Sequence, residues 1–175
     1  KFIKNRTFIR NNLDFFIDGC DLIKKADQQI LIASEMKKIY KNKALSLETR
    51  MASFFPIIKF SKDIKDIKKE VLNAIQAHKK SSKNPMEHHA VTSTIVELLT
   101  ELEEYDKARD LASNELRTSH SPAYFMRHLA SIAKKQKKTD EAIMWHRKAW
   151  QNSKGHATKF EVGTSYLLSL IDLRP

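Results

Sequence analysis

The chain has 175 residues, of which 41% are hydrophobic, and this is enough for one domain with a substantial buried core. Its three glycines and four prolines are too few for a β-sandwich or barrel, which needs a turn about every ten residues. The single cysteine, Cys20, excludes an internal disulfide and a cysteine metal cluster. Abundant Leu, Ile, Ala, Lys and Glu predict an all-α fold.

The net charge of +11 is unevenly distributed along the chain. Residues 1–85 hold 19 Lys and Arg against 9 Asp and Glu (+10), whereas residues 86–175 hold 13 against 12 (+1). The lysines are scattered at solvent-facing spacings, and a genome rich in A and T would give the same surplus without an acidic partner. Binding of nucleic acid or another acidic partner through the basic N-terminal half therefore stands as the alternative hypothesis.

Apolar residues recur at spacings of three and four almost throughout, and the breaks fall at turn and capping residues. Residues 1–83 are predicted to form about four helices, at 6–24, from near Asp27 to the polar turn 41–43, from near Ser46, and from Asp63. The third is expected to be cut or kinked around Pro56, because proline removes a backbone donor and clashes with the preceding turn. The polar stretch 79–83 is the candidate linker.

Residues 84–175 are predicted to form tetratricopeptide-like repeats and a terminal capping helix, probably in one continuous domain with the first part. Asn84–Pro85–Met86–Glu87 indicates a helix start, with asparagine as the cap and proline in the first position. Further helices are expected at 86–104 and 106–118, from Ser121–Pro122, from a Thr139–Asp140 cap to Gly155, and at about 157–172. The whole chain is thus expected to contain about nine helices.

A repeat of 34 residues is the most informative feature of the sequence. Asp106–Lys107–Ala108 recurs as Asp140–Glu141–Ala142, and 34 residues is the tetratricopeptide period. Small residues are needed where the second helix of each pair crosses the first. We therefore expect a right-handed solenoid of antiparallel helix pairs, in which Trp150 lies in the core, Trp145 lines a contact between repeats, and His146 stands where an aromatic residue is usual.

Short runs in the second half of the chain occur in an order that is typical of one protein family. They are 119–126, 133–137, Glu141–Ala142 followed by Trp145, 153–159, 163–166 and 170–173. On these runs, the segment from about Ala26 to Pro175 resembles the helical C-terminal region of bacterial proteins with an N-terminal thioredoxin-like domain. The resemblance implies a parent that exchanges thiols and disulfides, in the periplasm, with a Cys-x-x-Cys upstream of Lys1.

For this chain, the resemblance implies a non-catalytic binding, spacing or oligomerising role. Thiol exchange needs a resolving partner thiol, which Cys20 lacks. The chain begins without a starter methionine or a signal-like segment, which suggests a fragment of something longer. No apolar run is long enough to cross a bilayer.

A protein or peptide partner is the expected ligand, and the candidate binding residues follow from the geometry of such repeats. The first helix of each pair lines the concave surface, and its residues outside the packing stripe face the partner. These residues are Ser93, Glu97, Thr100, Tyr124, Arg127, Ser131 and Lys134. The turn between the repeats, Ser119–His120–Ser121–Pro122, could also contact a partner, although a helix cap is the simpler role for His120.

Catalytic and metal sites are not predicted, and no cofactor is expected. His88 and His89 are adjacent and would point about 100° apart on a helix, and no carboxylate-backed i, i+4 pair of histidines occurs. The neighbours of Ser119 and His120 do not resemble the strained turn that presents a hydrolase nucleophile. The sequence therefore predicts an interaction domain and no enzyme.

Overall fold

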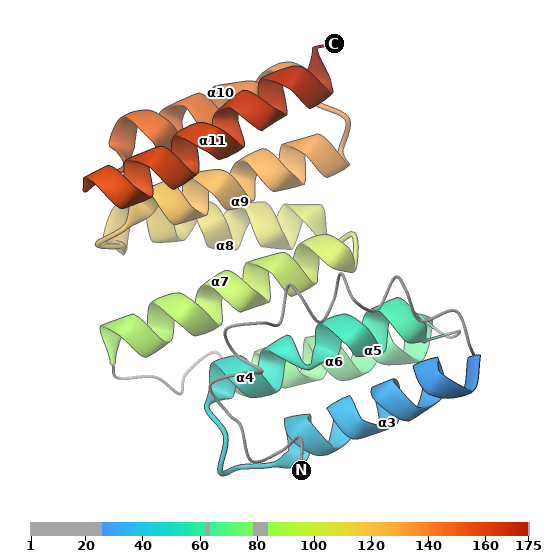
Figure 1. Ribbon diagram of the computed structural model, residues 1–175. Helices are drawn as coiled ribbons and strands as arrows, with labels where there is room; N and C mark the ends of the chain where they lie inside the picture. The colour runs from blue at the N-terminus through green and yellow to red at the C-terminus, as the bar shows by residue number, and fades with distance from the viewer. Residues whose placement is uncertain (1–25, 62–63, 79–83, 175) are drawn as a thin grey trace. The chain divides into compact units, whose positions relative to one another are not determined.

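The computed structural model describes residues 26–61, 64–78 and 84–174 (Figure 1). All regular structure in these ranges is helical, and none of them contains a strand, which confirms the all-α prediction. The helix predicted at 6–24, the helix start predicted at Asp63, the linker at 79–83 and Cys20 lie outside the described residues.

The chain divides into two compact units, residues 1–94 and 95–175. The first unit contains α3 (Ala26–Lys41), α4 (Leu47–Ala52), α5 (Phe54–Phe60) and α6 (Ile64–His78). Helix α7 (Pro85–Glu101) begins in the first unit and ends in the second. The second unit continues with α8 (Tyr105–Thr118), α9 (Pro122–Lys135), α10 (Thr139–Asn152) and α11 (His156–Leu173). The division falls inside α7, later than the boundary expected at 83/84.

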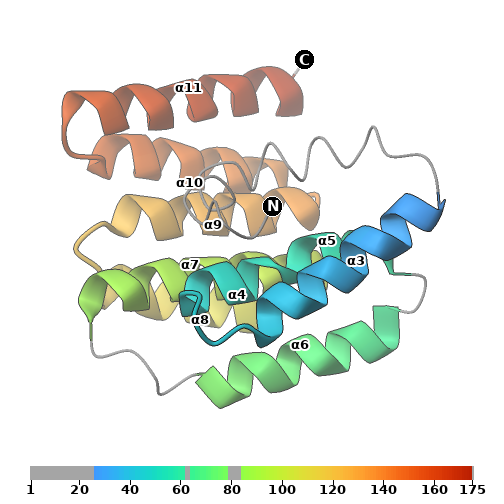
Figure 2. The ribbon, with the colours of Figure 1, turned by 60° about the horizontal axis from the view of Figure 1, so that its bottom comes forward.

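In the first unit, α3 packs on α4 and α5, and α5 packs on α6 (Figure 2). Met51, Phe54 and Ile57 are fully buried, and the ring centroids of Tyr40 and Phe54 lie 4.6 Å apart. These side chains come from three short segments that none of the helices could bury alone. They form the core of this unit.

The break expected at Pro56 lies at Ser53 instead. Ser53 ends α4, and its hydroxyl donates a hydrogen bond of 2.7 Å to the Arg50 carbonyl. Pro56 lies buried in the first turn of α5, where backbone N–H groups have no partner within the helix. The missing donor of Pro56 therefore costs little there.

Two predicted helix starts are confirmed and two predicted caps are wrong. Ser46 Oγ accepts from the Thr49 N–H at 3.2 Å, and Asn84 Oδ1 accepts from the Met86 N–H at 2.9 Å, just before Pro85 begins α7. Lys138, not Thr139–Asp140, occupies the position before α10, and its side chain makes no capping hydrogen bond. Gly155 does not end α10 but precedes α11, with a φ of 80° that glycine adopts without strain.

In the second unit, α8 packs on α9, α9 on α10 and α10 on α11 (Figures 1 and 2). Helix α9 buries its large side chains completely, as Phe125, Leu129 and Ile132 show. The neighbouring helices instead bury alanines: Ala108 and Ala112 of α8, and Ala142 and Ala149 of α10, are fully buried. Large side chains on one helix thus lie against small ones on the next, so the backbones approach closely.

The turns that follow α7 and α9 have the same backbone conformation, 34 residues apart. Glu103 and Lys137 are the two non-glycine residues with positive φ in the described ranges, at 60° and 59°. The hydrogen bonds that close the turns are Glu104 N to Leu99 O at 2.8 Å, Lys138 N to Ala133 O at 2.9 Å, Glu103 N to Thr100 O at 3.1 Å and Lys137 N to Lys134 O at 2.9 Å. Both are Schellman turns, in which the left-handed position is usually glycine.

Replacing Lys137 by glycine should raise the free energy of unfolding by roughly 0.5–1 kcal/mol, because glycine has no Cβ to strain the left-handed conformation. Lys138→Gly is the matched control, since Lys138 has a φ of −91° and gains only freedom in the unfolded chain. Urea denaturation followed by circular dichroism measures both variants. Equal destabilisation by the two substitutions would contradict this account of the turn.

Candidate protein-interaction surface

Ion pairs connect α9 to the end of α7 within the second unit. Lys135 Nζ lies 3.2 Å from Glu101 Oε1, and the two residues are 34 positions apart. His128 Nδ1 lies 3.7 Å from Glu97 Oε1, a contact that becomes an ion pair when the histidine is protonated. The acidic partners lie on α7 and the basic ones on α9.

On its other side, α9 is connected to α11 in the same sense. Arg127 Nη1 donates to Glu161 Oε1 at 2.8 Å, again across 34 positions, and Lys134 Nζ donates to Asp172 Oδ2 at 3.2 Å. A row of basic side chains on α9 therefore lies between acidic side chains of α7 and α11. These pairs are largely exposed to solvent, so each contributes little to the stability of the fold.

Helix α10 has ion pairs of its own, with α8 and with the end of α11. Arg109 of α8 donates to Glu141, which also accepts from Trp145 Nε1 at 3.3 Å. The hydrogen bond from Arg109 lowers the pKa of Glu141, while partial burial acts in the opposite direction. Arg174 pairs with Asp140, again across 34 positions.

Four of the predicted binding residues form one exposed stripe on α9. Tyr124, Arg127, Ser131 and Lys134 follow at spacings of three and four, and the two basic ones are those that pair with α11. The opposite side of the helix is buried. We call these four residues the α9 stripe; Glu97, from α7, contacts the same helix through His128.

Two other predicted binding residues do not belong to this surface. Thr100 is buried, and its hydroxyl donates to the Val96 carbonyl at 2.7 Å, so the last turn of α7 uses it internally. Ser93 is half-buried in the part of α7 that belongs to the first unit. The helical spacing that placed them with Glu97 could not show which side of α7 is covered.

The turn 119–122 is organised by a residue other than the one expected. Ser119 Oγ accepts from the Ser121 N–H at 3.1 Å, whereas the Ser121 side chain makes no capping hydrogen bond to α9. Pro122 is the first residue of α9, as expected, and His120 is exposed. This turn presents His120 to solvent without a role in the helix start that the structure defines.

The sequence placed Trp150 in the core, but the residue is partly exposed. Its ring stacks on Tyr166 with centroids 6.1 Å apart and covers Gly163 of α11. A Cβ at Gly163 would lie 3.1 Å from Trp150 Nε1, so the glycine makes room for the ring. Trp145 lies on another side of α10, where Lys148 Nζ is 4.7 Å from its ring centroid.

The acidic partners of the α9 stripe were not predicted, although the sequence contained a signal for one of them. Arg127 and Glu161 carry opposite charges exactly one 34-residue period apart, as do Lys135 and Glu101. Lys134 and Asp172 are 38 positions apart and follow no such rule. A search for opposite charges at the repeat period would have found the first two pairs.

His146 is half-buried on α10, and its Nδ1 has no hydrogen-bond partner in the described part of the chain. Burial lowers the pKa of its imidazole, and the positive charges of Arg127 and Lys134 lower this pKa further. The neutral imidazole is therefore the form that the folded state favours. It fills the position where the repeat pattern led us to expect an aromatic ring.

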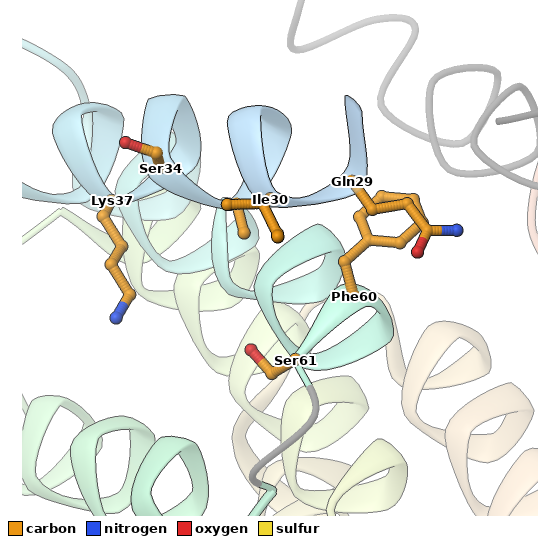
Figure 3. A pocket seen from close by; sticks show the side chains of 7 residues that line it. Gln29, Ile30, Ser34, Lys37, Phe60 and Ser61 are labelled. Carbon is orange, nitrogen blue, oxygen red and sulfur yellow. The ribbon is translucent and has the colours of Figure 1, made fainter. Parts of the chain in front are cut away.

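The first unit has a cavity of about 420 Å³ between α3 and α5 (Figure 3). Its lining residues are Gln29, Ile30, Ala33, Ser34, Lys37, Phe60 and Ser61. The single charged group among them, Lys37 Nζ, lies 3.8 Å from Glu70 Oε2. The lining offers apolar contact and a few hydrogen bonds, without an acid, base and nucleophile that converge. The sequence did not predict this cavity.

Comparisons with family models, with curated proteins and with solved structures find no match to this chain. None of the described helices is long and apolar enough to cross a membrane. Nor do three His, Cys, Asp or Glu side chains gather anywhere in the described ranges to hold a metal ion. The case for a function must therefore be made from the residues of the chain itself.

The folded state should lose stability as the pH falls below the ordinary histidine pKa of 6.5, because the unfolded chain protonates His146 before the folded chain does. His146→Phe removes this titration and fills the same space. The difference in free energy of unfolding between variant and wild type should thus grow in favour of phenylalanine between about pH 7.5 and pH 5. A difference that stays constant with pH, in urea denaturation, would contradict it.

Proposed function

We propose that the chain is a non-catalytic protein-interaction module, and that its second unit is a tetratricopeptide-like array of antiparallel helix pairs. The 34-residue recurrence of the Schellman turns supports this arrangement, since Glu103 and Lys137 hold the same φ. Ion pairs at the same period, such as Arg127 with Glu161, support it independently. In arrays of this kind, each unit contacts its neighbours and the exposed side of the first helices binds the partner.

The observation that carries the proposal is the α9 stripe, which combines an exposed aromatic ring with fixed cations. Tyr124 offers an apolar face and a hydroxyl at an exposed position. Arg127 and Lys134 are held in place by Glu161 and Asp172. A peptide that laid an apolar side chain on Tyr124 and carboxylates on the two cations would find the contacts already oriented.

The ion pairs favour this use of the stripe rather than opposing it. Because solvent-exposed pairs contribute about 0–1 kcal/mol, a carboxylate of the partner can replace Glu161 beside Arg127 at little cost. Arginine can bind a carboxylate through two parallel hydrogen bonds, which fixes the direction of the peptide. We therefore infer that the partner segment is acidic.

From the resemblance alone, we further propose that the parent protein exchanges thiols and disulfides in the bacterial periplasm through a thioredoxin-like domain. The runs 119–126 and 153–159 are among the segments that carry the resemblance. On this proposal, the present chain holds a client or a second subunit near the redox site. Insulin reduction by the full-length parent but not by this chain would support it, and inactivity of both would overturn it.

The alternative, an acidic partner or nucleic acid at the basic N-terminal half, has less support. In the first unit, Lys37 lies 3.8 Å from Glu70 and Lys38 lies 2.5 Å from Glu35, so these lysines do not form an unpaired basic patch. Binding to nucleic acid would also weaken steeply as salt rises, because it releases counterions.

The double variant Tyr124→Ala plus Arg127→Ala should lower affinity for acidic peptides at least tenfold, because it removes the aromatic contact and one cation. An array of immobilised peptides of graded charge measures this, with the selected peptides then titrated in solution by calorimetry. Gln151→Ala, at an exposed position of α10, should bind as the wild type does.

Glu161→Gln distinguishes a direct role of Arg127 from a structural one. It breaks the same ion pair but leaves the guanidinium in place, so affinity for acidic peptides should hold or rise. If Glu161→Gln weakened binding as much as Arg127→Ala does, the pair would act only through the fold. Wild-type affinity in the double variant would sink the assignment of the surface.

A further inference from the structure

Helix α11 leaves one long apolar face uncovered. Phe160 is 79% exposed, Leu167 61%, Leu168 55% and Ile171 66%. The remaining residues of this face are small, since Ala157 and Thr164 lie between them at helical spacing. All six lie on one side of the helix, and none of them is charged.

The opposite side of α11 is already in use. Val162 and Ser169 are buried, Trp150 of α10 covers Gly163, and Glu161 and Asp172 pair with α9. The uncovered face therefore does not belong to the packing of α11 on α10. Monomeric proteins seldom leave four large apolar side chains together on one helix without a partner for them.

The equivalent face of α9 shows what kind of element fits there. Phe160 and Leu167 stand 34 positions after Met126 and Ala133, and Ala133 is fully buried in the second unit. Helix α9 packs against a further helix, α10, with its own alanines in the contact. By the same geometry, the face of α11 fits an α-helix with an uncharged stripe.

We propose that this face binds the same face of a second copy of the chain, so that two α11 helices pair antiparallel in a twofold dimer. Helix α11 itself presents the uncharged helical stripe that the face requires. With the twofold axis between Thr164 and Leu167, Phe160 packs on Ile171 of the second copy, and Thr164 lies opposite Leu167 of the second copy. Large residues then meet one another at the ends and small meets large at the centre.

The size and charge of the face are compatible with such a dimer. The four large side chains expose on the order of 500 Å² per copy, so that two copies bury roughly 1,000 Å², the lower limit for a specific interface. Glu161 and Asp172 flank the face, but Arg127 and Lys134 already neutralise them. The pairing thus brings no unpaired like charges together, and we expect a weak, concentration-dependent dimer.

Analytical ultracentrifugation of the full chain over a range of concentrations tests the dimer, with Leu167→Glu as the disrupting variant. Leu31→Glu is the matched control, because Leu31 of α3 is also 61% exposed and takes the same substitution. Circular dichroism confirms that each variant keeps the helix content of the wild type. The wild type and Leu31→Glu should dimerise alike, and Leu167→Glu should raise the dissociation constant at least tenfold.

Two outcomes overturn the proposal: a wild type that stays monomeric at every concentration, or a dimer that Leu167→Glu leaves intact. The first would leave the face to another partner, and the second would place the dimer interface elsewhere. Peptide binding by the α9 stripe is measured separately and does not depend on Leu167. The dimer can therefore fail while the proposed function stands, and the reverse is also possible.

Discussion

The close approach of consecutive helices is the constraint on which the second unit depends. Ala108 and Ala112 on α8, and Ala142 and Ala149 on α10, are fully buried, so these helices can lie near the large side chains of α9. A larger residue at any of these positions would force strained side chains or a backbone shift. Once the approach is fixed, the turns must return the chain at the same distance each time. This explains why two non-glycine residues, Glu103 and Lys137, both accept a strained left-handed conformation.

The same constraint determines where the charges meet. Helices that lie at a fixed spacing with a fixed period bring residue i beside residue i+34, as in Arg127 with Glu161 and Asp140 with Arg174. Each exposed pair is weak, but together they penalise any slip of one helix along the next, because a slip would set like charges or unpaired ones in contact. The pairs thus act on register more than on stability. They also hold the cations of the α9 stripe at defined positions, as a binding surface needs.

The sequence predicted the elements of the second unit well, because local physics determines them. Pro85 and Pro122 begin helices where the missing N–H is harmless, and the alanines of the 34-residue pattern are buried as expected. It failed where the outcome depends on which side of a helix a distant segment covers. Thr100 and Trp150 illustrate this, since spacing placed each on a face of its helix but could not say what lies against that face. Pro56 failed for a related reason: the rule on proline depends on its position in the helix, and that position was set by Ser53.

The contrast between α9 and α11 links these points to function. Both helices follow a turn after a helix that buries alanines, and both present charged residues toward each other. Helix α9 is covered on its apolar sides by α8 and α10, so only polar residues and Tyr124 remain exposed. Helix α11 has α10 on one side and retains Phe160, Leu167 and Ile171 on the other. An array that ended in water would be expected to end in a polar face, because a terminal unit has no neighbour to bury its apolar residues. The composition of α11 is that of an internal helix, and an internal helix requires a contact on both sides.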